Sequence, residues 1–342
     1  MKIINKKILN VCIIFVSFLS FYANFNYANT VNLLTNYEYF EVINLASDSA
    51  EYELNLADSL LKLNDFIGAK THYNNALKIN PDFAETHVSL GKLLQNNFED
   101  YEGAKTHYLK ALEINPKDFI LHHNLADIMV VVFKDYEGAK MHYLKAIEIN
   151  PEYAYAYNNL GILYDENYGD KEEAKKYYIL AIKTDSNYAF PHNNLAILLE
   201  EKSDFKGAKE HYLKAIEKNP DYSDAHNNLA NLLLNHFEDS EGAKEHYLKA
   251  IEKNPDHSDA HFNLANLLFN NFNNSESAKE HLIKAIEINP DPKFVFSLLI
   301  FANLLKEKYR DDEGAKKLYI IAISIDPESK DDFFDEYFGI SK

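Results

Sequence analysis

A repeat of 34 or 35 residues runs through the chain and limits it to architectures made of stacked similar units. An Asn-Pro pair, or a variant of it, closes each unit, and the spacing rises to 37 residues only at the last step: the pairs lie at 80–81, 115–116, 150–151, 185–186, 219–220, 254–255, 289–290 and 326–327. Two alanine columns keep the same register, one from Ala69 to Ala315 and one from Ala76 to Ala322. We therefore expect eight units, with none skipped.

Each unit is expected to contain two helices. In residues 241–254, Ala243, Tyr247, Ala250 and Ile251 recur at helical spacing and form one apolar face. Acidic residues precede this segment and a proline ends it, as at many helix termini. Residues 223–235 have the same kind of pattern and predict the first helix of the pair. A hairpin of this size cannot bury its apolar stripe alone, so neighbouring hairpins must stack, with the alanines at the contact points.

The spacing of Leu229, Leu233, Ala243, Tyr247 and Pro255 resembles that of the tetratricopeptide repeat family, with one extra residue between the two helices in most units. The resemblance covers about residues 50–329. It implies an all-α fold, a right-handed superhelical solenoid of eight tetratricopeptide-type helix-turn-helix repeats. It further implies that the first helices line a concave groove that holds an extended or helical peptide.

Polar residues of the first helices are the candidate binding site. On a helix whose core face is Leu229, Ala230 and Leu233, the side chains of Asp224, Asn227, Asn228 and Asn231 point roughly the opposite way and are expected to have no packing role. The column of Asn228 is asparagine in six of eight units. An asparagine amide both donates and accepts, so such a ladder can hold a peptide backbone with little sequence preference. The candidate ladder residues are Asn124, Asn158, Asn159, Asn193, Asn194, Asn227, Asn228, Asn231, Asn263 and Asn266.

This ladder is similar to the asparagine ladder in the repeat region of O-linked N-acetylglucosamine transferases, although no sugar-transferase domain follows it. The alternative interpretation is a solvated surface that duplication has copied from unit to unit. Aromatic and acidic residues flank the ladder, namely Tyr155, Phe190, Phe262, Asp224 and Asp259. They favour a basic or amphipathic peptide as partner. The clustered Lys and Arg that clamp a C-terminal carboxylate in chaperone-tail binders are missing.

Histidines form two further columns, one in the first helices from His87 to His261 and one in the second helices from His72 to His281. Members of one column are a whole repeat apart, about 10 Å, which is too far to share a metal ion whose bonds are about 2 Å long. We therefore expect no metal site. A chain so rich in histidine is expected to lose stability near pH 6.

Charge and motifs exclude other functions. The formal net charge is -18, so nucleic acid is not an expected partner. No phosphate-binding glycine loop and no His-Glu-x-x-His helix occurs, and no carboxylate pair stands out. The expected protein is therefore not an enzyme, uses no cofactor, and binds a protein or peptide. The rival interpretation is a structural or self-associating envelope protein that uses its convex face or the C-terminal aromatic residues.

The two ends of the chain differ from the repeats. Residues 1–28 combine a basic start, an apolar run from Ile8 to Tyr22 and small residues at Ala23 and Ala28, as in a secretory signal peptide. Export is expected, to the periplasm, the cell envelope or the medium; an uncleaved membrane anchor is the alternative. Residues 29–49 are interpreted as an N-terminal cap and residues 330–342, with Phe333 and Phe338, as a C-terminal cap.

Overall fold

The computed structural model describes residues 49–291, 294–307 and 310–329. These residues form helices and turns, and none of them lies in a β-strand. The predicted signal segment, the C-terminal cap and the N-terminal cap apart from Ser49 lie outside the described residues. Within the described part, no helix is both long enough and apolar enough to cross a membrane. The chain divides into two compact units, one ending at Pro151 and one beginning at Glu152.

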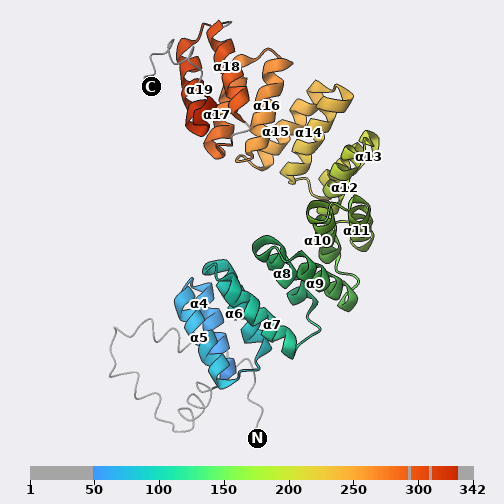
Figure 1. Cartoon of the computed structure of the whole chain (residues 1–342), viewed down its shortest axis with the longest axis vertical. Coiled ribbons are helices and arrows are strands. Elements are labelled where there is room, and N and C mark those ends of the chain that lie inside the picture. Colours follow the sequence, from blue (N-terminus) through green and yellow to red (C-terminus); the bar gives the residue numbers. More distant parts are fainter. Residues whose placement is uncertain (1–48, 292–293, 308–309, 330–342) are drawn as a thin grey trace, which may run out of the picture. The chain divides into compact units, whose positions relative to one another are not determined.

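The described residues of the N-terminal unit form three helical hairpins (Figure 1). Helix α4 pairs with α5, α6 with α7, and α8 with α9, and a short π-helical segment, η2, continues α8. Ser49 caps the first of these helices, because its side chain accepts a hydrogen bond from the backbone N–H of Tyr52. The bounds are α4 Ala50–Lys62, α5 Phe66–Ile79, α6 Ala84–Asn97, α7 Tyr101–Ile114, α8 Phe119–Ile128, η2 Met129–Phe133 and α9 Tyr136–Ile149.

In the part of the C-terminal unit that the structure describes, five more hairpins run from α10/α11 to α18/α19, and a 3-10 turn, η5, follows them. These hairpins confirm the all-α class and the helix-turn-helix repeats predicted from the sequence. The bounds are α10 Ala154–Ile162, η3 (π-helical) Leu163–Asn167, α11 Lys171–Thr184, α12 Ala189–Glu201, α13 Phe205–Lys218, α14 Ser223–Phe237, α15 Ser240–Lys253, α16 Ser258–Asn270, α17 Ser275–Ile288, α18 Val295–Glu307, α19 Asp312–Ile325 and η5 Pro327–Ser329.

The turn inside each hairpin has a common design. One residue adopts a left-handed backbone conformation, and an Asp or Asn then caps the second helix: the left-handed residues are Asn64, Glu99, Lys134, Gly169, Ser203, Glu238, Asn273 and Arg310. In α15, the Asp239 side chain accepts from the backbone N–H of Gly242. This glycine leaves room for the cap, since a Cβ atom there would lie 2.4 Å from a carboxylate oxygen.

The extra residue of the longer units is absorbed at this turn. In the two units with 34 residues, the backbone N–H of the capping Asp donates to the carbonyl five residues earlier, as from Asp204 to Leu199. In the longer units the same N–H donates to the carbonyl six residues earlier, as from Asp239 to Leu233. The wider turn places an aromatic ring beneath a lysine of the preceding hairpin, as with Phe237 and Lys209.

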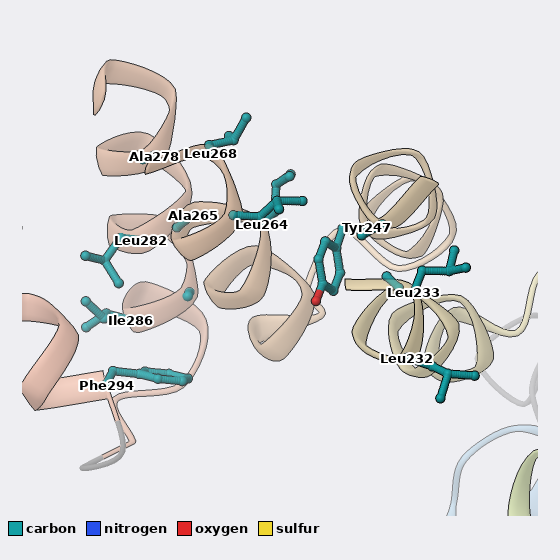
Figure 2. Close-up of a cluster of buried hydrophobic side chains, with 14 of the residues drawn as sticks. Leu232, Leu233, Tyr247, Leu264, Ala265, Leu268, Ala278, Leu282, Ile286 and Phe294 are labelled. Carbon is teal, nitrogen blue, oxygen red and sulfur yellow. The ribbon is translucent and has the colours of Figure 1, made fainter. Parts of the chain in front are cut away.

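The alanine columns and the second-helix tyrosines form the core. Ala243 and Ala250 are fully buried, and Tyr247 is only 1% exposed. Figure 2 shows the Tyr247 ring between the helix that carries Leu233 and the helix that carries Leu264. Small side chains let the helices approach, and the tyrosine fills the space between hairpins, as interior packing density requires. The face of each first helix that points away from this core is therefore fixed in direction.

Candidate functional site: the asparagine ladder and an aromatic strip

The asparagines of the first helices form two linked columns in the C-terminal unit. The inner column is Asn158, Asn193 and Asn227, and the outer column is Asn159, Asn194, Asn228 and Asn263. Outer amides donate across hairpins: Asn194 Nδ2 to Asn158 Oδ1 at 3.1 Å, Asn228 Nδ2 to Asn193 Oδ1 at 3.2 Å, and Asn263 Nδ2 to Asn227 Oδ1 at 3.1 Å. Each link joins a first helix to the first helix of the preceding hairpin.

The expectation that this face has no packing role is wrong for the inner column. Asn158, Asn193 and Asn227 are 3%, 4% and 6% exposed. They are covered because the first helices of consecutive hairpins touch, a contact that the pattern of a single helix cannot reveal. Burial of an amide is tolerated where it is hydrogen-bonded, and the outer column supplies those bonds. The inner asparagines therefore support the outer ones.

Other predicted ladder residues have different surroundings. Asn231 is half-buried and its Oδ1 accepts a hydrogen bond of 2.5 Å from the Tyr247 hydroxyl, so this residue is tied to the core. Asn266 is half-buried on α16. Asn124 is half-buried on α8, in the N-terminal unit, and so belongs to a separate compact body. The outer asparagines Asn194, Asn228 and Asn263 are half-buried and keep a second amide hydrogen beyond the one used between hairpins.

Five aromatic rings form a continuous strip beside the ladder, which we call the aromatic strip. Ring centroids are 5.5 Å apart for Tyr153 and Tyr155, 4.7 Å for Tyr155 and Tyr188, 5.6 Å for Tyr188 and Phe190, and 4.7 Å for Phe190 and Tyr222. Tyr155 and Phe190 are 51% and 45% exposed. Tyr153, Tyr188 and Tyr222 immediately precede α10, α12 and α14. Tyr155 and Phe190 are the second residues of α10 and α12.

The sequence predicted only part of this strip. Tyr155 and Phe190 were identified, whereas Tyr153, Tyr188 and Tyr222 were missed, although they recur at repeat spacing two positions before the identified column. Phe262 does not join the strip. Its ring stacks on Phe294 with centroids 4.5 Å apart and packs against the core, so Phe262 flanks the ladder without contacting the other two predicted aromatics.

Acidic residues continue the exposed column of the strip. Asp224 is the second residue of α14 and Asp259 is the second residue of α16. They take the helix position that Tyr155 has on α10 and Phe190 has on α12. Asp224 Oδ1 lies 3.0 Å from His257 Nε2, and hydrogen bonding to that imidazole lowers the pKa of the Asp224 carboxyl. Along the first-helix face, the surface therefore changes from aromatic to acidic.

The two histidine columns meet inside the hairpins. Nδ1 atoms of a first-helix and a second-helix histidine lie 2.8 to 3.0 Å apart in five pairs: His87 with His107, His122 with His142, His192 with His211, His226 with His246, and His261 with His281. In the first hairpin, Glu53 takes the first-helix position and contacts His72 at 2.6 Å. This pairing joins two columns and was not predicted, because only residues of the same column lie at repeat spacing in the sequence.

Hydrogen bonds define the tautomers of most pairs. In four of them, Nε2 of the first-helix histidine lies 2.9 to 3.4 Å from a proline carbonyl oxygen and must donate to it. Its Nδ1 then accepts, and the second-helix Nδ1 carries the shared hydrogen. Burial, together with the partner imidazole in each case, lowers the pKa of His142, His192 and His246 to about 4. These three imidazoles are therefore neutral at pH 7, and the Nδ1–Nδ1 contacts join the helices of a hairpin.

Metal binding needs more ligands than a pair provides. Within the described residues, no group of three His, Cys, Asp or Glu side chains is arranged to hold a metal ion.

Comparison with known proteins identifies the repeat. Models described as tetratricopeptide repeat match residues 142–176, 211–245 and 246–280, and residues 84–118; a model described as TPR repeat matches residues 57–97. No curated protein matches the sequence.

Several solved structures are similar in fold. The human IFIT1 dimer with m7Gppp-AAAA is 18% identical, over 85% of this chain and 71% of that one, with a TM-score of 0.59. The pilF protein of Pseudomonas aeruginosa is 21% identical, over 65% of this chain and 99% of that one, with a TM-score of 0.54. YrrB, a TPR protein with an unusual peptide-binding site, is 28% identical over 54% and 93% of the two chains, with a TM-score of 0.41.

Proposed function

We propose that this chain, which is built from tetratricopeptide repeats, is a protein-binding scaffold that holds a peptide or protein segment along the first-helix face of its C-terminal unit. Repeats of this kind generally act as noncatalytic scaffolds, and we propose no reaction and no cofactor. The main support is the outer asparagine column. Its amides are held in register by the inner column, and Asn194, Asn228 and Asn263 keep hydrogen-bonding capacity beyond their inter-hairpin bonds.

A fixed row of amides is suited to a peptide backbone. Each peptide group offers one donor and one acceptor, and a side-chain amide can match both. Because the outer asparagines are already oriented, a bound peptide costs little additional side-chain ordering. The neighbouring Asp224 and Asp259 favour a partner with basic residues, and the formal net charge of -18 opposes nucleic acid. The expected partner is therefore a basic or amphipathic protein segment.

Export is part of the proposal. The basic and apolar segment in residues 1–28 supports secretion or a location in the cell envelope, with membrane anchoring by that segment as the alternative. Fractionation of cells that express the full chain, followed by N-terminal sequencing, tests this part. Protein that begins after residue 28 in the exported fraction supports cleavage. Intact protein in the membrane fraction supports the anchor.

Self-association is the competing function. The second helices carry a column of outward leucines, of which Leu213 and Leu248 are 45% and 46% exposed in the C-terminal unit. Such a column could join two copies through their second helices. Light scattering of the purified full chain decides the question: a monomer over a wide concentration range opposes self-association.

A capture experiment tests the scaffold proposal. The full chain is used as bait for exported proteins, in parallel with a variant in which Asn159, Asn194 and Asn228 are replaced by Ala. The matched control is Asn271→Ala, because the amide of Asn271 also bonds another hairpin, through Ser240 Oγ at 2.9 Å, but lies outside the first-helix face. Circular dichroism must show that all three proteins are folded. A partner that is lost only from the triple variant supports the proposal, and equal capture by all three contradicts it.

A further inference from the structure

The aromatic strip spans three consecutive hairpins and is continuous enough to follow one extended peptide. The steps of 4.7 Å from Tyr155 to Tyr188 and 5.6 Å from Tyr188 to Phe190 place the rings of Tyr155 and Phe190 at most about 10.3 Å apart. The same two step lengths separate Tyr188 from Tyr222, through Phe190. A polyproline II helix repeats every three residues, or about 9.3 Å. This repeat falls within the bound of about 10.3 Å between equivalent rings.

Ring and amide alternate on the same helix face. Tyr155 and Asn159 are four residues apart on one first helix, as are Phe190 and Asn194 on the next, so each ring lies one turn before an outer asparagine. A polyproline II backbone has no internal hydrogen bonds, and its carbonyl groups need outside donors. The asparagine amides are such donors. Each of these two hairpins therefore offers one apolar surface for a proline ring and one donor for the adjacent backbone.

Other peptide conformations match less well. An α-helix read at every seventh residue has a similar period, about 10.5 Å, but its backbone groups are already paired, so it would leave the amides unused. A β-strand repeats its side chains on one face about every 6.8 Å and, unlike a proline-rich segment, must be ordered on binding. Aromatic-lined surfaces are a recurring mode of binding proline-rich segments, because the polyproline II conformation is already ordered before binding.

Charge adds a requirement at one end of the strip. Where the next ring of the column would stand, the chain has Asp224, whose side chain is 63% exposed, followed by Asp259. We propose that the aromatic strip and the outer asparagines bind a proline-rich segment in the polyproline II conformation, with a Lys or Arg after the prolines to meet Asp224. This inference rests on the proposed peptide-binding role of the first-helix face and names the class of peptide.

Fluorescence anisotropy with labelled synthetic peptides tests the inference on the full chain. The probes are a ten-proline peptide with arginines at both ends, a peptide of the same charge and length with alanine in place of proline, and an amphipathic basic helix. The variant is Tyr155→Ala with Phe190→Ala. The control is Leu248→Ala, since Leu248 is as exposed as Phe190 but lies on a second helix. Circular dichroism verifies folding of each protein.

The expected result is that the proline peptide binds at least tenfold more tightly than the alanine peptide, and that the double variant loses at least tenfold in affinity while Leu248→Ala does not. Equal affinity for the two peptides, or equal binding by the double variant, overturns the inference. If the amphipathic helix binds instead and is lost on replacing the asparagines, the scaffold proposal stands and only the peptide class is wrong. If no peptide binds, while the capture experiment also yields no partner, both proposals fail.

Discussion

The Nδ1 atoms of His122 and His142 lie 2.8 Å apart, on the two helices of one hairpin, and share a single hydrogen. The outer nitrogen of His122 is 3.3 Å from the carbonyl oxygen of Pro116, which closes the preceding unit. One pair of imidazoles therefore connects both helices of a hairpin and the loop before it. Four other hairpins repeat the pairing. In the fourth hairpin along the chain, α10/α11, Tyr157 and Tyr177 take the two positions that histidines take in those hairpins.

We predict that stability falls as the pH drops below about 6.5. The folded-state pKa of His142, His192 and His246 is lowered to about 4, whereas the value for an unfolded histidine is about 6.5. Stability from the neutral pairs is therefore complete above about 6.5 and declines progressively between about 6.5 and 4, because the unfolded chain takes up protons first. Melting temperatures at pH 7.5, 5.5 and 4.5 measure the effect.

A matched variant separates histidine from carboxylate effects. His226→Tyr with His246→Tyr copies the tyrosine pair of the fourth hairpin, and the fall in melting temperature between pH 7.5 and 5.5 should become smaller. An unchanged melting temperature of the parent protein across this range contradicts the assignment of neutral, shared-proton pairs.

The Tyr247 hydroxyl predicts a graded loss of stability. Tyr247→Phe removes the 2.5 Å hydrogen bond to Asn231 and should cost about 1 kcal/mol. Tyr247→Ala also removes the ring between neighbouring hairpins and should cost about 3–5 kcal/mol. Urea unfolding followed by circular dichroism measures both. Equal midpoints for the parent and Tyr247→Phe would show that the hydroxyl bond adds no stability.

The second-helix caps predict that two substitutions are not additive. Asp239→Ala removes the cap of α15 and should cost about 1 kcal/mol. Gly242→Ala should weaken this cap and cost less than Asp239→Ala, because its Cβ would lie 2.4 Å from the Asp239 carboxylate, which must shift as the caps beside Glu173 and Ser277 show it can. In the double variant the obstructing carboxylate is gone, so the combined loss should be smaller than the sum of the single losses. Thermal melts of the three variants and the parent test this, and strict additivity contradicts the clash.

The two asparagine columns predict different phenotypes for adjacent residues. Asn193 is 4% exposed and accepts from Asn228, so Asn193→Ala leaves a buried gap and should cost about 1–3 kcal/mol. Asn194 is only half-buried, so Asn194→Ala should destabilise less and should weaken partner capture more than its stability loss explains. Melting curves and capture yields of both variants compare the columns. A larger stability loss for Asn194→Ala than for Asn193→Ala contradicts the division into support and contact.

The sequence predicted the hairpins well because their determinants are local. Ala243, Tyr247 and Ala250 recur on one face of one helix, and Asp239 and Pro255 bracket that helix, so its core face could be derived without knowledge of any neighbour. The buried state of these residues agrees with that derivation.

Features that depend on contacts between helices were not predicted. Asn227 points away from the core of its own hairpin but is covered by the neighbouring first helix, and only the stacking geometry reveals this. His226 and His246 are 20 residues apart, and their meeting depends on how two helices are aligned within the hairpin. Phe262 flanks the ladder as Tyr155 does, but its stacking on Phe294 depends on the next hairpin and could not be derived from one helix.

Site-specific photocrosslinking tests most directly the claim that the first-helix face binds a protein segment. A photoreactive phenylalanine replaces Phe190 on the first-helix face in one protein and Leu248 on the outer side of a second helix in another; both positions are about equally exposed. Illumination in the presence of exported proteins, followed by mass spectrometry, identifies what each position contacts. The account predicts a crosslinked partner segment at position 190 and none at position 248. Crosslinks at position 248 alone would contradict it and place the interaction on the second helices.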